Sequence, residues 1–91
     1  MIGNRPTLME FELTKHAHEA AAEREILVEW IRRTLEEPQL VVPEPGDPTV
    51  ERRFRRIPEH GNRILRVAVN IAVDPIRVVS VFFDRKMKGR L

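Results

Sequence analysis

Alternating apolar and polar side chains predict β-strands in the second half of the chain. The alternation runs through three segments, separated by turn-forming residues at 58–62 and by an Asp-Pro pair at 74–75. Two shorter strand candidates, 8–13 and 40–42, lie in the first half, and the second of them is expected at a sheet edge. The main strands are expected at residues 50–57, 63–73 and 76–84.

The residues between the two short strand candidates have a helical pattern. Thr14 suits the N-cap of a first helix over about residues 15–25, where three consecutive alanines have high helix propensity. A second helix is expected over residues 27–37, and Pro38 marks its end. Its core-facing residues are expected to be Leu27, Ile31 and either Leu35 or Trp30.

The two-residue period of a strand places neighbouring side chains on opposite faces of the sheet. In the strand over residues 63–73 one face contains Leu65, Val67, Val69, Ile71 and Val73, whereas the other contains Ile64, Arg66, Ala68 and Asn70. In the last strand, Val79, Val81 and Phe83 alternate with Val78, Ser80 and Phe82. With the apolar faces against the helices, the opposite surface is expected to carry Arg66, Asn70, Ser80 and Phe82.

These elements predict a single α+β domain that spans residues 1–91. Two N-terminal helices would pack on one face of a three- to four-stranded antiparallel β-sheet. Residues 1–7 are expected to form a loose N-terminal tail and residues 86–91 a basic C-terminal tail. A hydrophobic content of 42% and a charged content of 33% fit a soluble globular domain.

The amino-acid composition excludes several kinds of binding site and a membrane-spanning helix. The chain has no cysteine, which excludes disulfides and cysteine-based zinc sites. His16 and His18 would diverge on a helix, so we expect neither a metal nor a cofactor. No apolar run reaches the roughly 20 residues of a membrane span, and the N-terminus lacks a signal-peptide pattern. We therefore expect a cytoplasmic protein with no membrane partner.

Charge divides the chain into an acidic and a basic half. Residues 1–48 contain five Arg or Lys and ten Asp or Glu, a net −5, and residues 49–91 contain eleven and four, a net +7. Thirteen of the sixteen cations are arginine, whose planar fork matches phosphate oxygens. We expect an anionic partner, with RNA favoured over an acidic protein. The expected nucleic-acid-binding residues are Arg52, Arg53, Arg55, Arg56, Arg63 and Arg85. A charged edge strand that resists aggregation is an equal interpretation of residues 52–56.

Several short motifs resemble those of a known family. They are LTKHA at 13–17, EREI at 23–26, WI at 30–31, EP at 37–38, RILRV at 63–67 and VSVFFDR at 79–85. Their order and spacing, over about residues 11–85, resemble a small bacterial domain-of-unknown-function family with a TKHA…ER-I opening. That family is similar to the RelE and BrnT-type toxins, which have a compact α+β fold and cleave RNA without a metal.

The resemblance implies a catalytic site made of His16, Arg24, Arg66 and Ser80. In metal-independent RNA cleavage, His16 would act as base or acid and the two arginines would hold the phosphate. Ser80 would position a phosphate oxygen. The chain departs from the family pattern, because Phe82 occupies the place of a usual Tyr and no Arg follows the His-Ala pair closely. A mechanism that needs a phenol is therefore excluded.

Three functions remain open, and so does the question of whether the chain is an enzyme. A RelE/BrnT-like ribonuclease requires His16, Arg24 and Arg66 to converge, and it fails if His16 and Arg66 lie on opposite sides of the sheet. A non-catalytic module would instead bind nucleic acid or an acidic antitoxin-like protein through the arginine-rich hairpin. Arg24 would then serve in a structural ion pair, for example with Asp84. The third function is homodimer formation through an exposed edge strand, as opposed to a monomer.

Overall fold

The computed structural model describes residues 9–91, so the tail predicted at 1–7 lies outside the described residues. The helices are α1 (Lys15–Glu23) and α2 (Val28–Glu36), and two 3-10 helices are η1 (Pro58–His60) and η2 (Arg85–Met87). The strands are β1 (Phe11–Leu13), β2 (Leu40–Glu44), β3 (Asp47–Ile57), β4 (Arg63–Asn70) and β5 (Ile76–Phe83). No helix among these elements is long and apolar enough to cross a membrane.

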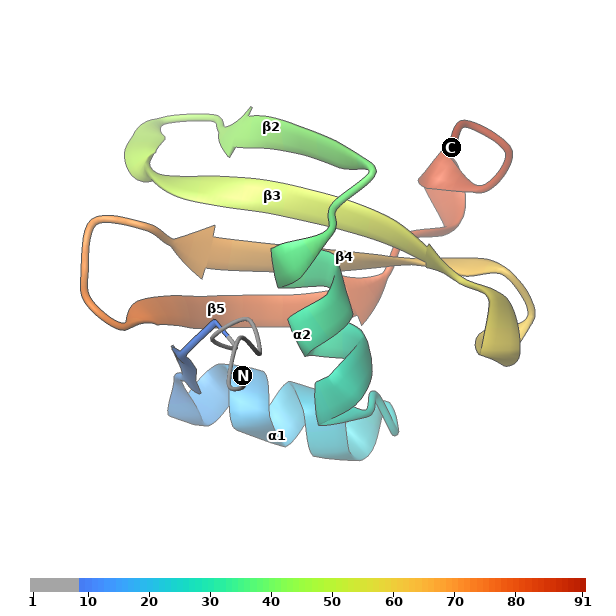
Figure 1. Ribbon diagram of the computed structural model, residues 1–91, viewed down its shortest axis with the longest axis horizontal. Coiled ribbons are helices and arrows are strands. Elements are labelled where there is room, and N and C mark those ends of the chain that lie inside the picture. The colour runs from blue at the N-terminus through green and yellow to red at the C-terminus, as the bar shows by residue number, and fades with distance from the viewer. Residues whose placement is uncertain (1–8) are drawn as a thin grey trace, which may run out of the picture.

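The five strands form one sheet in the order β1-β5-β4-β3-β2 (Figure 1). Hairpins join β2 to β3, β3 to β4 and β4 to β5, and these neighbours are antiparallel. β1 pairs with β5 in parallel, so the sheet is mixed. The prediction of a three- to four-stranded antiparallel sheet was wrong in this respect. No hairpin joins β1 to β5, and most of the chain lies between them, so their relative direction is not fixed by a tight turn.

Both helices pack on the same face of the sheet, which confirms the predicted two-helix α+β arrangement (Figure 1). Trp30, Ile31 and Leu35 of α2 share one buried cluster with Leu65 and Val67 of β4. α1 contributes small side chains to this cluster, and it runs alongside β5. The alanines that it buries are Ala17, Ala20 and Ala21.

Neither α1 nor α2 packs on the opposite face of the sheet, and we call it the open face. Arg66 lies on it between its cross-strand partners, Phe54 of β3 and Phe82 of β5. Ser80 lies opposite Ala68 on the same face. The predicted position of Arg66, Asn70, Ser80 and Phe82 on one surface, away from the helices, is therefore confirmed.

A bulge in β5 changes the predicted alternation. Ala68 pairs with Ser80 and Val69 pairs with Val78, so Val79 is an extra residue on β5. Val78 is fully buried and Val81 is 1% exposed, and both belong to the core. The prediction that Val79 shares the core face with Val81 was wrong, because a strict two-residue period does not survive an inserted residue.

The junction between the helices is a Schellman motif. The amide of Ile26 donates to the Ala21 carbonyl at 2.8 Å and the amide of Glu25 donates to the Ala22 carbonyl at 3.3 Å. Glu25 has φ of 56°, the left-handed conformation that ends such helices. α1 therefore ends at Glu23 and Ile26 becomes the buried residue, 5% exposed. The expectation that Leu27 faces the core was wrong, since Leu27 is the N-cap residue of α2 and is 55% exposed.

Candidate anion-binding site

The arginine-rich segment at 52–56 lies in β3, which is second from the edge of the sheet and not an edge strand. Arg52 donates two hydrogen bonds to the Glu44 carboxylate, each of 2.8 Å. These bonds hold the pKa of Glu44 below its usual range. Arg53 donates to Glu51, with a shortest distance of 3.0 Å. Two of the predicted nucleic-acid-binding arginines are thus already paired with carboxylates.

The remaining arginines of β3 also have partners. Arg53 donates to the Leu35 carbonyl at 2.8 Å and Arg55 donates to the Glu37 carbonyl at 2.6 Å. Both carbonyls belong to the C-terminal end of α2, where backbone oxygens lack helical partners. Arg56 donates to the Leu91 carbonyl, which ties the C-terminal segment to β3. The β3 arginines therefore hold elements of the fold together.

The four residues predicted to be catalytic do not come together. Arg66 and Ser80 lie on the open face, whereas His16 lies in α1 and Arg24 is the C-cap residue of that helix, which packs on the other side of the sheet. The predicted convergence of His16 with Arg66 was therefore wrong. His16 and Arg24 are themselves eight residues apart, about 12 Å along a helix axis. Arg66 pairs with Asp84 at 3.4 Å and lies over Phe82 at 4.6 Å, so the predicted Arg24–Asp84 ion pair is replaced by this one.

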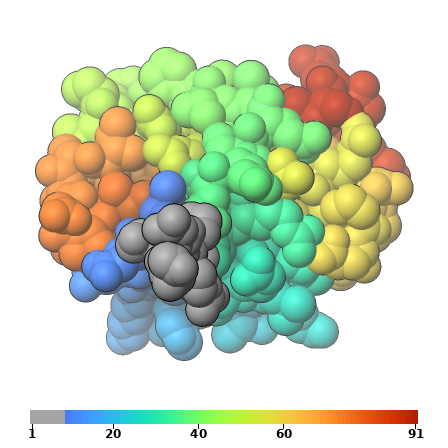
Figure 2. All heavy atoms as spheres, viewed as in Figure 1, coloured from blue at the N-terminus to red at the C-terminus, as the bar shows by residue number. Residues whose placement is uncertain are grey.

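Cations from three distant segments instead surround two adjoining hollows at one end of the sheet. One hollow, of about 380 Å³, is lined by Arg24, Arg63, Phe82, Phe83 and Arg85. The second, of about 350 Å³, shares Arg63, Phe83 and Arg85 and adds Lys88. We call the two together the basic hollow. The C-terminal residues and the β3–β4 turn that contribute to it lie at the same end of the molecule (Figure 2).

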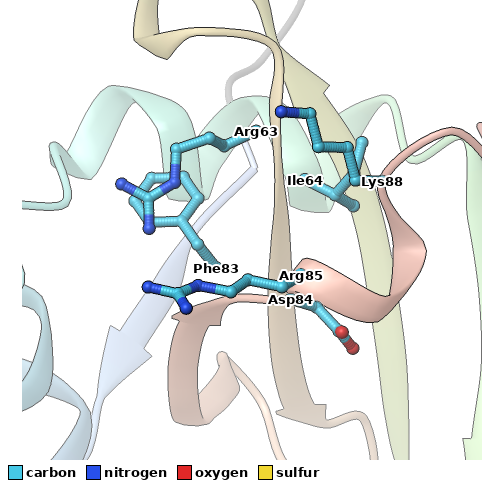
Figure 3. A pocket seen from close by; sticks show the side chains of 6 residues that line it. All are labelled: Arg63, Ile64, Phe83, Asp84, Arg85 and Lys88. Carbon is cyan, nitrogen blue, oxygen red and sulfur yellow. The ribbon is translucent and has the colours of Figure 1, made fainter.

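The four cations of the basic hollow have no carboxylate partner within residues 9–91. Asp84 is the one acid in its wall, and its two oxygens accept hydrogen bonds from Arg66 and from the Lys86 amide. Figure 3 shows the Asp84 carboxylate pointing away from the guanidinium groups of Arg63 and Arg85, which extend in a common direction. The positive charge of the hollow is thus exposed and is not neutralised by a carboxylate of the described residues.

Aromatic contacts fix the floor of the hollow. The Arg63 guanidinium lies 4.4 Å from the centroid of the Phe83 ring, and the His60 ring stacks on Phe83 at 4.8 Å. Arg63 Nη1 is 3.1 Å from His60 Nε2. Trp30 supports the group from the core, 5.0 Å from His60 and 6.2 Å from Phe83. Arg63 is therefore held in position before any ligand binds, which lowers the entropic cost of binding.

An ion pair anchors the loop that carries His60. Arg33 of α2 donates two hydrogen bonds to the Glu59 carboxylate, at 2.9 and 2.8 Å. This contact lowers the pKa of Glu59 to about 2. Gly61 follows His60 with φ of 67°, so the turn into β4 uses a conformation that glycine adopts without strain. The loop is thus attached to the helix layer on one side of the hollow.

The sequence identified part of this site. Arg63 and Arg85 were predicted to bind nucleic acid, and Arg24 was predicted to hold a phosphate. Lys88 and His60 were missed, because Lys88 lies in the predicted basic tail and His60 in a turn. Their joint position depends on three segments separated by more than twenty residues each, and no motif spacing encodes that. Within residues 9–91, no three His, Cys, Asp or Glu side chains cluster as a metal site would require.

The fold and the site define a small α+β domain with two helices on one face of a mixed sheet and a cationic hollow at one end. The chain belongs to the DUF4258 family, a domain of unknown function, whose profile matches residues 13–83. The matched segment includes Arg24, Arg63 and Phe83, whereas Arg85 and Lys88 follow it. No curated protein and no solved structure matches the chain.

Proposed function

We propose that the chain binds RNA, and that the basic hollow is where the RNA backbone contacts it. One observation carries this proposal: Arg24, Arg63, Arg85 and Lys88 gather around one concavity without a carboxylate partner in residues 9–91. Six other arginines within residues 9–91 pair with carboxylates, as Arg52 with Glu44 shows, and Arg55 and Arg56 donate to backbone carbonyls. Unpaired cations that repel one another cost stability, and an anionic ligand removes that cost.

Phosphate is the anion that fits this group best. Three of the four cations are arginines, which bind phosphate oxygens through paired N–H donors. Phosphodiesters supply a row of such anions along a flexible strand, and the two hollows share one continuous wall. An acidic protein, such as an antitoxin-like partner, would compete for the same cations. Such a partner would be identified by its ability to displace bound RNA from the chain.

RNA cleavage without a metal is the second candidate function, and it follows the resemblance to the RelE and BrnT-type toxins. The position of His60 favours it, because this histidine contacts Phe83 and Arg63 at the hollow. His16 has no place in this version of the site. RNA degradation in a chelating buffer that is lost in His60→Gln and retained in His16→Gln would support cleavage. Intact RNA with the unsubstituted protein would overturn it and leave the binding proposal standing.

The binding proposal is tested with a fluorescently labelled RNA at low salt. In the double variant Arg63→Gln/Arg85→Gln, the affinity measured by fluorescence anisotropy is expected to fall by about tenfold or more, because two charge-assisted contacts are lost. The control is Lys15→Gln/Arg77→Gln, which removes the same charge from exposed side chains outside the hollow. Equal losses in the two double variants would show that net charge alone binds RNA, and would contradict the proposed site.

A further inference from the structure

The rings of the basic hollow already carry cations on their faces. Arg63 lies 4.4 Å from the centroid of Phe83, and His60 stacks on the same ring at 4.8 Å. Arg66 lies 4.6 Å from the centroid of Phe82. Proteins that bind single strands through their bases stack those bases on exposed aromatic rings. These contacts cover part of each ring, so a base stacking in the hollow would compete with Arg63 and His60 at Phe83 and with Arg66 at Phe82.

The polar groups of the hollow are almost all donors. Arg24, Arg63, Arg85 and Lys88 have N–H groups and no acceptor. The Asp84 carboxylate is held by Arg66 and the Lys86 amide. Distinguishing the amino groups of adenine and cytosine requires an acceptor aimed at the base edge. A wall of donors fits phosphate oxygens and offers no acceptor for the amino groups of adenine and cytosine. Guanine, whose O6 and N7 accept hydrogen bonds from arginine, is therefore the base against which base-independent binding has to be tested.

The hollow has two lobes with overlapping sets of cations. Arg24 belongs to one lobe and Lys88 to the other, whereas Arg63 and Arg85 line both. Each lobe therefore presents three cations to one anion, and the shared pair lies between the two anions. Figure 3 shows the Arg63 and Arg85 guanidinium groups reaching in the same direction from β4 and from the segment after β5.

We propose that the basic hollow binds two successive phosphates of a single-stranded nucleic acid and does not read its bases. This inference rests on the proposed function and specifies its ligand. A single strand can bend so that neighbouring phosphates enter adjoining lobes. Because the contacts would be to phosphate, the 2′-hydroxyl that distinguishes RNA from DNA is not recognised. The hollow therefore recognises the spacing of the phosphates along the nucleic-acid strand.

The test compares labelled single strands of equal length: homopolymers of uridine, adenosine, cytidine and thymidine, a strand in which guanosine alternates with adenosine, and an abasic strand. Affinities are expected to agree within about threefold, as for sequence-tolerant binding. A preference of about tenfold for one base, or a loss of that size with the abasic strand, would overturn the inference while leaving the proposed function intact. Failure of every strand to bind would instead overturn the proposed function.

The two-lobe arrangement has its own readout. Arg24→Gln and Lys88→Gln each remove a cation from one lobe, so each is expected to reduce the slope of log affinity against log salt by about 0.7 for a single strand. Lys86→Gln, an exposed cation of the same segment outside the hollow wall, is expected to change the slope little. Inorganic pyrophosphate is expected to displace the strand at lower concentration than orthophosphate. Equal competition by the two anions, or no slope change in either lobe variant, would contradict two phosphate positions.

Discussion

At the scale of single residues, the partner of an arginine decides whether it can contribute to binding. Arg52 and Arg63 both lie on strands of the basic half, yet Arg52 is held by Glu44 whereas Arg63 lies on the Phe83 ring. Binding phosphate with Arg52 would first require that its two hydrogen bonds to Glu44 break. Arg63 requires no such exchange. Equal residue types in neighbouring strands therefore have different roles.

Glu59 provides a pH test of the anchor that holds the His60 loop. Arg33 lowers the pKa of Glu59 to about 2, so the ion pair stabilises the fold above the unfolded-state pKa and this contribution disappears as pH falls through about 2. In Glu59→Gln, we expect a small decrease in the melting temperature at neutral pH. The difference from the unsubstituted protein should shrink between pH 4.5 and 2. A difference that stays constant over this range would contradict the ion-pair account.

At the scale of elements, single residues determine how each helix ends. The backbone of Glu25, just after α1, is in the left-handed conformation, which costs any residue with a Cβ atom about 1 kcal/mol or more. Arg53 and Arg55 of β3 donate to carbonyls at the C-terminal end of α2. The helix layer is thus attached to the sheet by arginines as well as by its apolar core.

We predict that Glu25→Gly stabilises the protein, because glycine adopts the left-handed conformation without strain. The expected gain in the free energy of unfolding is about 0.5–1 kcal/mol, after the greater entropy of glycine in the unfolded chain is included. Chemical denaturation measures it. The matched control is Glu19→Gly inside α1, which should destabilise by about 1 kcal/mol. A loss of stability in both variants would show that the left-handed conformation of Glu25 does not lower the stability of the protein.

Arg53→Met is predicted to separate the structural role of β3 from binding. The substitution keeps the apolar stem and removes the hydrogen bonds to the Leu35 carbonyl and to Glu51. We expect the free energy of unfolding to fall by about 1–2 kcal/mol. RNA affinity should stay within about threefold of the unsubstituted protein, since no hollow cation is removed. A tenfold loss of RNA affinity in a variant that still folds would show that Arg53 contacts the RNA.

At the scale of the whole molecule, the charge split of the sequence is only partly satisfied by ion pairs between its halves. Glu12 with Arg77 and Glu44 with Arg52 join an acid of the first half to an arginine of the second, whereas Arg33 with Glu59 joins the halves in the opposite sense. The other three ion pairs of residues 9–91 lie within one half. The cations left over after this pairing include those of the basic hollow.

The salt dependence of binding measures how many cations the bound strand contacts. If the hollow alone contacts the strand and neutralises two phosphates, the slope of log affinity against log salt is expected at about −1.4 for a single strand. Participation of the four β3 arginines would add about −2.8 to that slope. A titration over salt concentration, with anisotropy as the readout, distinguishes the two. A slope of about −4 would contradict a site confined to the hollow.

Much of the fold was predictable from the sequence, because the spacing of apolar residues and the positions of turn residues determine helices and strands locally. The pattern gave both helices, the Thr14 N-cap and the β3–β5 strands, and Thr14 accepts a hydrogen bond from the Ala17 amide at 3.1 Å. The parallel pairing of β1 and the bulge at Val79 were not predictable. The alternation of apolar and polar residues does not show in which direction two strands pair, nor which apolar residue of a strand is the inserted one. The candidate site was predictable only in part, because Arg24, Arg63 and Lys88 meet only through the tertiary fold.

A nucleic-acid strand that contacts the basic hollow and not strand β3 would leave a distinct pattern in the NMR signals of the arginine side chains. Arginine Nε–Hε signals are followed during titration with a single-stranded RNA. The signals of Arg24, Arg63 and Arg85 are expected to shift with a common dissociation constant, while those of Arg52 and Arg53 stay in place. Shifts centred on Arg52 and Arg53, with Arg63 and Arg85 unchanged, would contradict binding at the hollow.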